Sequence, residues 1–175
     1  MTTYVALLRG INVGGHRRVP MADLRELCAA VGFGSVATYV QSGNVVFTDH
    51  GSAADVQHRL EVAIAERFGF AVHVVVRTRA ELAAVASAHP FADRQADIVK
   101  LHVFFLGGEP DRERVAALDV TRFVPDELAL SGRELYVHFP NGAGRSKLKF
   151  DLGVPATARN WRTVGALLAL ADAIG

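Results

Sequence analysis

The sequence predicts an α+β protein built from two similar halves. Short apolar runs, which are typical of buried strands, alternate with segments whose apolar residues recur at helical spacing. In residues 1–90 these segments follow the order β-α-β-β-α-β, the split unit of a ferredoxin-like sandwich. Residues 91–175 partly repeat that order, although individual residues show no repeat. We therefore expect two ferredoxin-like halves, each an antiparallel sheet with its helices packed on one face.

The first half is expected to hold strands at four apolar runs, namely residues 4–8, 36–40, 44–48 and 72–76. The turn QSG at residues 41–43 joins the middle pair as a hairpin. A first helix begins at Pro20, whose fixed φ suits a first turn, and Gly32 ends it. A second helix follows the capping residue Ser52 and ends at Gly69. Each helix carries one apolar stripe, so one sheet face has to bury both stripes.

The second half is expected to begin after Pro90, at the polar, turn-like stretch FADRQAD. A linking helix is expected at residues 79–89, just before this half begins. The half itself is expected to hold a strand at 99–106, a short helix at 110–118, and hairpin strands at 127–131 and 134–139. A closing helix places Val164, Leu167 and Ala171 on one face. The two predicted domains, residues 1–90 and 91–175, both fall within usual domain sizes.

Composition excludes several classes of protein. Lys and Arg number 19 against 18 Asp and Glu, so the chain is not a uniformly basic nucleic-acid binder, although a local basic patch is allowed. The single cysteine, Cys28, excludes an internal disulfide and a cysteine-rich zinc site. It shares a stripe with Met21 and Leu24, which predicts a buried, unreactive thiol. No signal peptide or long apolar span is evident, so we expect a cytoplasmic protein.

A glycine-rich loop, RGINVGGHRRV, follows the first strand at residues 9–19. Backbone amides in such a loop can cradle an anion, and four side chains add positive charge, namely Arg9, His16, Arg17 and Arg18. No acidic residue occurs before Asp23. The spacing matches neither a dinucleotide fingerprint nor a P-loop, so a plain crossover loop with solvated arginines is the alternative.

A second loop, NGAGRSK, occupies residues 141–147 and lies in the most basic stretch of the chain. The basic residues around it are Arg145, Lys147, Lys149 and Arg159, with Asp151 as the one acid between Pro140 and Trp161. The order does not match a Walker A loop, and a solvated charged face is the alternative. Since both loops follow strands and lack acids, we expect them to converge and bind a phosphate-bearing anion.

Other candidate residues carry weaker signals. Ser42 lacks the nucleophile-elbow pattern, and turn chemistry alone explains it. The 7 histidines show no metal-ligand spacing, so we expect no metal site, and no motif specifies a cofactor. Trp161, the single tryptophan, is suited either to stacking on a base or to anchoring a core.

Several strings together resemble the bacterial family known as domain of unknown function 1697, namely ALLRGINVGG, VPMADLR, TYVQSGNVVF, HVFFLGG, HFPNGAGRSKL and LGVPATARNW. The resemblance implies a duplication of two ferredoxin-like sandwiches, with no established reaction, cofactor or ligand. Together with the loop chemistry it points to candidate anion-binding residues: Arg9, Asn12, Gly14, Gly15, Arg17, Arg18, Ser42, Asn44, Arg145, Ser146, Lys147, Arg159, Asn160 and Trp161. Family members usually have a helical insert before LGVP, where this chain has only residues 149–151.

Three functions compete at this point. The first is a binding protein for a phosphate-bearing ligand, either a nucleotide, a phosphorylated metabolite or nucleic acid, although the aromatic signature of RNA-binding sheets is absent. The second is an enzyme acting on a phosphorylated or carboxylated small molecule, with Arg145 and Arg159 as an anion clamp and Ser42, Asn44 or His138 nearby. The third is a scaffold that binds protein partners and no small ligand.

Overall fold

The computed structural model describes the chain apart from the side chains of residues 94–96. The chain divides into two compact units. Unit 1 comprises Met1–Ala86 and Gly165–Gly175, and unit 2 comprises Ser87–Val164. The division after Ala86 lies close to the expected boundary at residue 90, whereas Gly165–Gly175, expected in the second half, group with unit 1.

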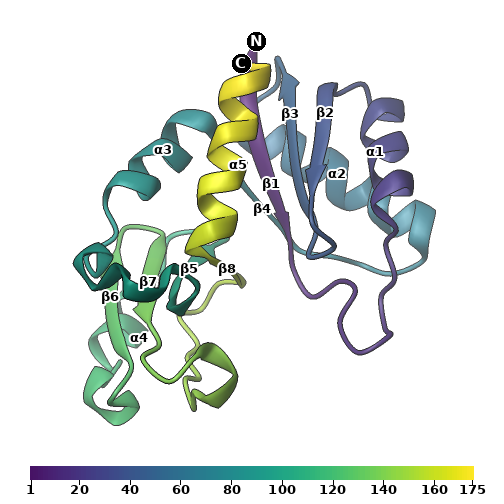
Figure 1. The fold of residues 1–175 in the computed structure, drawn as a ribbon. Helices are drawn as coiled ribbons and strands as arrows, with labels where there is room; N and C mark the ends of the chain where they lie inside the picture. Colours follow the sequence, from purple (N-terminus) through teal and green to yellow (C-terminus); the bar gives the residue numbers. More distant parts are fainter. The chain divides into compact units, whose positions relative to one another are not determined.

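The sheet of unit 1 has ferredoxin-like topology. Its strands are β1 (Thr2–Leu8), β2 (Gly34–Tyr39), β3 (Asn44–Asp49) and β4 (Val74–Thr78). They lie in the order β2-β3-β1-β4, and every neighbouring pair is antiparallel (Figure 1). The predicted hairpin of β2 and β3 is confirmed.

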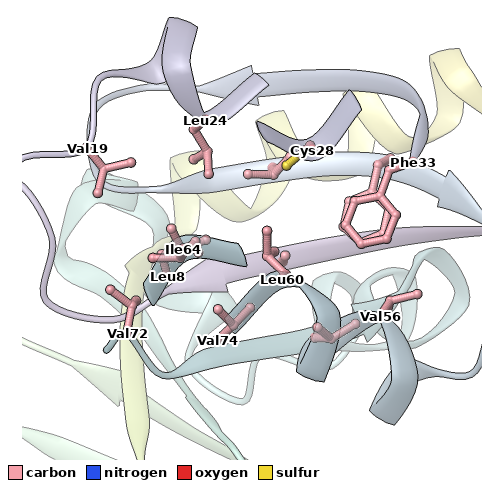
Figure 2. Close-up of a cluster of buried hydrophobic side chains, with 14 of the residues drawn as sticks. Leu8, Val19, Leu24, Cys28, Phe33, Val56, Leu60, Ile64, Val72 and Val74 are labelled. Carbon is pink, nitrogen blue, oxygen red and sulfur yellow. The ribbon is translucent and has the colours of Figure 1, made fainter. Parts of the chain in front are cut away.

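Helices α1 (Met21–Ala30) and α2 (Ala53–Phe68) cover one face of this sheet. Figure 2 shows Leu24 and Cys28 of α1 beside Leu60 and Ile64 of α2, with all four side chains fully buried. The expected cap is present, because the Ser52 hydroxyl accepts a hydrogen bond from the Asp55 amide at 3.2 Å. Burial raises the pKa of the Cys28 thiol to about 12, which keeps it protonated, as expected of a core thiol.

The opposite face of the unit 1 sheet is buried as well. Strand side chains alternate between faces, so Val5 and Leu7 of β1 point away from α1 and α2, yet both are fully buried. Within this unit, helix α3 (Arg79–Ser87) contributes buried Leu82 and Val85. The part of α5 (Trp161–Ile174) that belongs to the unit contributes Leu167 and Ala171. The sheet of unit 1 is therefore covered on both sides.

Unit 2 repeats the same sheet topology. Its strands are β5 (Leu101–Leu106), β6 (Glu127–Ser131), β7 (Glu134–His138) and β8 (Ala156–Asn160). They lie in the order β6-β7-β5-β8, again with antiparallel pairs throughout. The sequence analysis placed no strand at β8, because its residues ATARN form no apolar run. Pairing with the strongly apolar β5 holds this segment in the sheet.

The helices of unit 2 are much reduced. Helix α4 (Arg112–Ala116) buries none of its residues, and η1 (Ala92–Lys100), η2 (Val120–Phe123) and η3 (Ala143–Arg145) are 3-10 helices. The stretch FADRQAD, expected as a turn, lies largely within η1. Between β7 and β8, the position that α2 occupies in unit 1, residues 139–155 form only η3 and loops. Leu148 and Phe150 of these loops pack on the sheet in place of a helix.

The fourth strand of each sheet carries a buried arginine at an equivalent position. Arg77 of β4 lies opposite Val5 of β1, and Arg159 of β8 lies opposite Val103 of β5. Only 1% of Arg77 and 6% of Arg159 is exposed. In both cases Nη1 donates to the carbonyl oxygen of the preceding residue, at 2.9 Å in β4 and 2.8 Å in β8.

The residue after each buried arginine starts a helix. The Thr78 hydroxyl accepts from the Glu81 amide at 3.1 Å before α3, and Asn160 Oδ1 accepts from the Thr163 amide at 2.9 Å before α5. Such side-chain acceptors satisfy amides that the first helical turn leaves free. The duplication is therefore visible in individual residues, which the sequence analysis did not detect.

Candidate functional site

The first glycine-rich loop is a small β-hairpin, called here the basic hairpin (residues 9–19). The Asn12 amide donates to the Arg17 carbonyl at 3.1 Å, and the His16 amide donates to the Val13 carbonyl at 3.1 Å. Gly14 and Gly15 occupy the tip with φ of 59° and 78°. A two-residue turn with both φ values positive matches the right-handed twist of a hairpin and favours glycine. The glycine pair therefore builds a tight turn.

Asn12 fastens the base of the basic hairpin. Its Nδ2 donates to the carbonyl oxygens of Val19 at 2.9 Å and Gln41 at 2.8 Å, and its Oδ1 accepts from the Val19 amide at 2.8 Å. These bonds close the hairpin and attach it to the turn between β2 and β3. Asn12 was a candidate ligand-binding residue, and the structure shows its amide group holding the loop in place.

The turn between β2 and β3 uses two further candidates in the same way. Asn44 is fully buried, and its Nδ2 donates to the Tyr39 carbonyl at 2.8 Å and to the Ser42 hydroxyl at 2.9 Å. The Leu8 amide donates to the Gly43 carbonyl at 2.8 Å. A Cβ at residue 43 would lie 2.6 Å from Ile11 Cδ1, so only glycine allows this approach. Together these contacts lock the turn against β1 and the basic hairpin.

The side chains left exposed on the basic hairpin include three arginines, Arg9, Arg17 and Arg18, together with His16. Buried Ile11 and Val19 anchor the hairpin to unit 1, whereas Val13 at its tip is 68% exposed. In the described part of the chain, no carboxylate lies within ion-pair distance of these arginines. The hairpin therefore presents uncompensated positive charge to solvent.

The second candidate loop is anchored by Ser146 in unit 2. The Ser146 hydroxyl donates to Asp126 Oδ2 at 2.5 Å and accepts from the Leu148 amide at 2.9 Å. Arg145 and Lys147 on either side are exposed. The basic hairpin belongs to unit 1 and this loop to unit 2, so the convergence of the two loops stays a prediction.

The last three candidates lie at the junction of β8 and α5. Arg159 is interior, its Nη1 donates to the Thr157 hydroxyl at 2.7 Å, and burial lowers its pKa to about 10. Asn160 acts as the helix cap described above. The Trp161 ring meets the edge of the His89 ring at 4.7 Å between centroids. Trp161 is half-buried and packs on His89 in the structure, and stacking on a base stays a prediction.

His89 is the centre of an aromatic cluster that the sequence analysis missed. It is 5% exposed and its ring also lies 5.1 Å from that of Tyr136. Nδ1 accepts from the Phe91 amide at 3.2 Å, so the proton resides on Nε2, which faces the His102 carbonyl at 3.3 Å. Burial lowers the pKa of His89, so the ring is neutral at pH 7. His89, Tyr136 and Trp161 are far apart in the chain, and no pattern in the sequence links them.

A second histidine forms a pair across the β6–β7 hairpin. His138 Nδ1 lies 2.9 Å from Glu127 Oε2, and the two residues are direct partners in the sheet register.

Among the described residues, no group of three or more histidine, cysteine or acidic side chains is placed to hold a metal ion. In the same part of the chain, no helix has the length and apolarity needed to cross a membrane.

Topology and loop structure define this chain as a duplicated ferredoxin-like α+β protein with a basic hairpin after its first strand. The model of the family DUF1697, described as "Protein of unknown function", matches residues 1–136, and the chain belongs to this family. It is similar in structure to the conserved bacterial protein SP0830 from Streptococcus pneumoniae, with a TM-score of 0.76 and 27% sequence identity. That match covers 97% of this chain and 98% of the other. No curated protein matches the sequence.

Proposed function

We propose that this protein binds a phosphate-bearing ligand through the basic hairpin. The observation that carries the proposal is the group of exposed cations without carboxylate partners, held on a hairpin that is fixed at both its tip and its base. Like charges held close together repel, and a bound anion removes that repulsion. Arginine also offers paired donors that match two phosphate oxygens.

The shape of the hairpin favours a nucleic-acid backbone over a free nucleotide. Small ligands bind in concave sites that bury most of their surface. The basic hairpin instead extends from the end of β1, and its tip residues are exposed (Figure 1). An extended row of phosphates is able to contact several cations along such an exposed element without entering a pocket.

The test measures binding of a short labelled oligonucleotide to the full chain by fluorescence anisotropy, with a free nucleotide as competitor. We expect binding that weakens steeply with salt, because each neutralised phosphate releases counterions. Arg17→Gln and Arg18→Gln should each weaken binding, by about 1.5–3 kcal/mol if the contact is a charge-assisted hydrogen bond. Arg112→Gln, which removes an exposed arginine of α4 in unit 2, is the charge-matched control.

Two outcomes would refute the proposal. One is affinity that is equal in the wild type and in both hairpin variants, and the other is an equal loss in Arg112→Gln. Arg145→Ala tests the second loop separately, and a smaller thermal shift with phosphate ligands than in the wild type would support convergence of the two loops. The fold should survive this substitution, because Arg145 is exposed.

One observation supports the enzyme alternative. An imidazole held by a carboxylate, as in the pair of His138 and Glu127, is the arrangement of a general base. The measurement is a screen of phosphate monoesters and carboxylic esters for hydrolysis, with His138→Gln as the comparison. Turnover that persists in this variant would exclude the pair as the base.

A further inference from the structure

An open groove in unit 2 lies between α4, η2 and the short segment 149–151. Its volume is about 300 Å³, and its lining includes Arg114, Leu118, Arg122, Phe123, Lys149 and Phe150. This volume is at the lower end of the range for small-molecule sites. The groove contains none of the candidate residues proposed above, and it belongs to a different unit from the basic hairpin.

Several contacts hold the walls of the groove in position. Asp151 forms an ion pair with Arg114 and accepts from the Gly153 amide at 2.9 Å. The Asp111 amide donates to the Leu152 carbonyl at 2.9 Å, which ties the start of α4 to the chain after residue 151. The Phe150 ring packs edge-on against Phe104 of β5 at 5.1 Å. The groove is therefore formed before any ligand binds.

The charges of the groove are unbalanced. The two acids of the lining are Asp151, which pairs with Arg114, and Asp119, which accepts from the Thr121 amide at 3.0 Å and hydroxyl at 2.6 Å and keeps its negative charge near Arg122. Arg122 and Lys149 are exposed, and no carboxylate lies within ion-pair distance of either in the part of the chain that the structure describes. The lining thus holds three cations, Arg114, Arg122 and Lys149, against two carboxylates, which leaves one net positive charge.

We propose that this groove binds a phosphate monoester attached to a planar ring. A phosphate monoester is an anion at neutral pH, which suits a lining that has a net positive charge and exposes Arg122 and Lys149. The rings of Phe123 and Phe150 supply an apolar wall on which an aromatic or heteroaromatic ring packs. An aryl phosphate and a nucleoside monophosphate both carry a phosphate and a planar ring, so both fit a groove with a cationic lining and an apolar aromatic wall.

The experiment titrates the full chain by isothermal calorimetry with phenyl phosphate, a nucleoside monophosphate, inorganic phosphate and benzoate. Phenyl phosphate or the nucleotide should bind at least about tenfold more tightly than inorganic phosphate, which lacks the ring, and than benzoate, which carries one charge. The relative affinity of the first two probes distinguishes an aryl from a nucleoside ligand.

Variants separate the groove from general electrostatics. Arg122→Gln and Lys149→Gln should each weaken phenyl phosphate binding about tenfold or more, whereas Arg112→Gln, in α4 but outside the groove lining, should leave it unchanged. Phe123→Leu should weaken phenyl phosphate and leave inorganic phosphate unaffected. Thermal unfolding of each variant without ligand confirms that the fold is intact, and since Arg122 and Lys149 are exposed we expect no change.

The proposal fails if no ring-bearing phosphate binds more tightly than inorganic phosphate. It also fails if Arg122→Gln and Lys149→Gln bind as the wild type does, or if Arg112→Gln loses as much affinity as they do. Arg17→Gln combined with Arg18→Gln should leave phenyl phosphate binding unchanged. Loss of oligonucleotide binding in that double variant therefore reports on the basic hairpin alone.

Discussion

The two sheets of this protein have the same topology and differ in what covers the face that carries the helices. In unit 1, α1 and α2 lie on that face, and Leu8, Val45 and Phe47 beneath them are fully buried. In unit 2, the corresponding face holds fully buried Leu135 and Val137 beside Phe104 and Leu128, which are only partly buried, beneath loops and short helices. Strand pairing therefore defines the fold in both units, while helix packing decides how completely each core is closed.

This difference also explains where the groove occurs. Unit 1 fills the space above its sheet with the side chains of a 16-residue helix, α2. Unit 2 fills the equivalent crossover with Leu148 and Phe150. Two side chains on a loop cover less area than a helix, so an open groove remains beside them.

The largest expected effect tests this contrast in core closure directly. Leu60→Ala in α2 removes a fully buried side chain and should lower the free energy of unfolding by about 2–5 kcal/mol. Leu148→Ala removes a half-buried one and should lower it by less than about 2 kcal/mol. Urea denaturation measures both. Equal losses would show that the loop closes the core of unit 2 as well as the helix closes that of unit 1.

The next effect compares Asn44, which fixes the β2–β3 turn beside the basic hairpin, with Ser146, which anchors the second candidate loop. Asn44→Ala should lower the free energy of unfolding by about 1–3 kcal/mol, because the Tyr39 carbonyl and the Ser42 hydroxyl lose the fully buried donor that joins them. Ser146→Ala should cost about 1–2 kcal/mol, because Asp126, which is 8% exposed, loses a hydrogen bond while the Ser146 side is half-buried. Chemical denaturation with circular dichroism gives both values. A larger loss for Ser146→Ala would reverse the order of rigidity.

Acid should weaken unit 2 before unit 1. Burial lowers the pKa of His89 and His102 below the ordinary 6.5, so the unfolded chain binds protons first as the pH falls. Their contribution to stability is full above pH 6.5 and declines below it. In unit 1, burial raises the pKa of Asp49, but the hydrogen bonds from Arg59 and the Gly51 amide, together with the nearby positive charge of Arg59, outweigh burial, and the net shift is downward. The stabilisation that the ionised Asp49 carboxylate gives is lost only below pH 3.8.

Hydrogen exchange resolved by residue between pH 7.5 and pH 5 measures this difference. Protection should fall first for amides of β5 and β7 and later for those of β1 and β3. His89→Gln should flatten the pH dependence of unit 2, because it removes one of the two titrating rings. A simultaneous loss of protection in both units would show that they unfold together.

The smallest effect concerns a thiol. Cys28 should react with a thiol reagent only as fast as unit 1 opens, since its side chain is fully buried and its pKa is raised to about 12. Mass spectrometry of the native protein should show an unlabelled chain, with complete labelling in denaturant. Rapid labelling of the native chain would mean that α1 detaches readily from its sheet.

Much of the fold could be predicted from sequence because apolar periodicity and capping residues were clear. Ser52 and Gly69 mark the ends of α2 as the local chemistry requires. Strand β8 was missed because ATARN is held by pairing with β5, which is a long-range effect. The apolar stripe of the closing helix indicated a buried face, but it could not indicate that Gly165–Gly175 group with unit 1.

The candidate site could be predicted less well, and the reason is chemical. Polar loop residues that bind ligands and those that hold loops in place have the same side chains. Asn12 and Ser146 were selected as ligand contacts, and the structure shows that their side chains hold the loops in place, Asn12 through Val19 and Ser146 through Asp126. Arg159 was selected for its charge, yet it is interior and repeats the buried Arg77 of the other sheet. Only the packed structure separates these roles.

The open crossover between β7 and β8 makes segment 149–151 a natural point of insertion. Lengthening a surface connection adds little loop entropy, so an amphipathic helix placed here would be tolerated by the sheet. Its apolar side would displace Phe150 from Phe104 and occupy the space of the groove. A chain with such an insertion would gain a closed core and lose the groove at the same time. A closed core and an open groove are therefore alternative outcomes for one stretch of sequence.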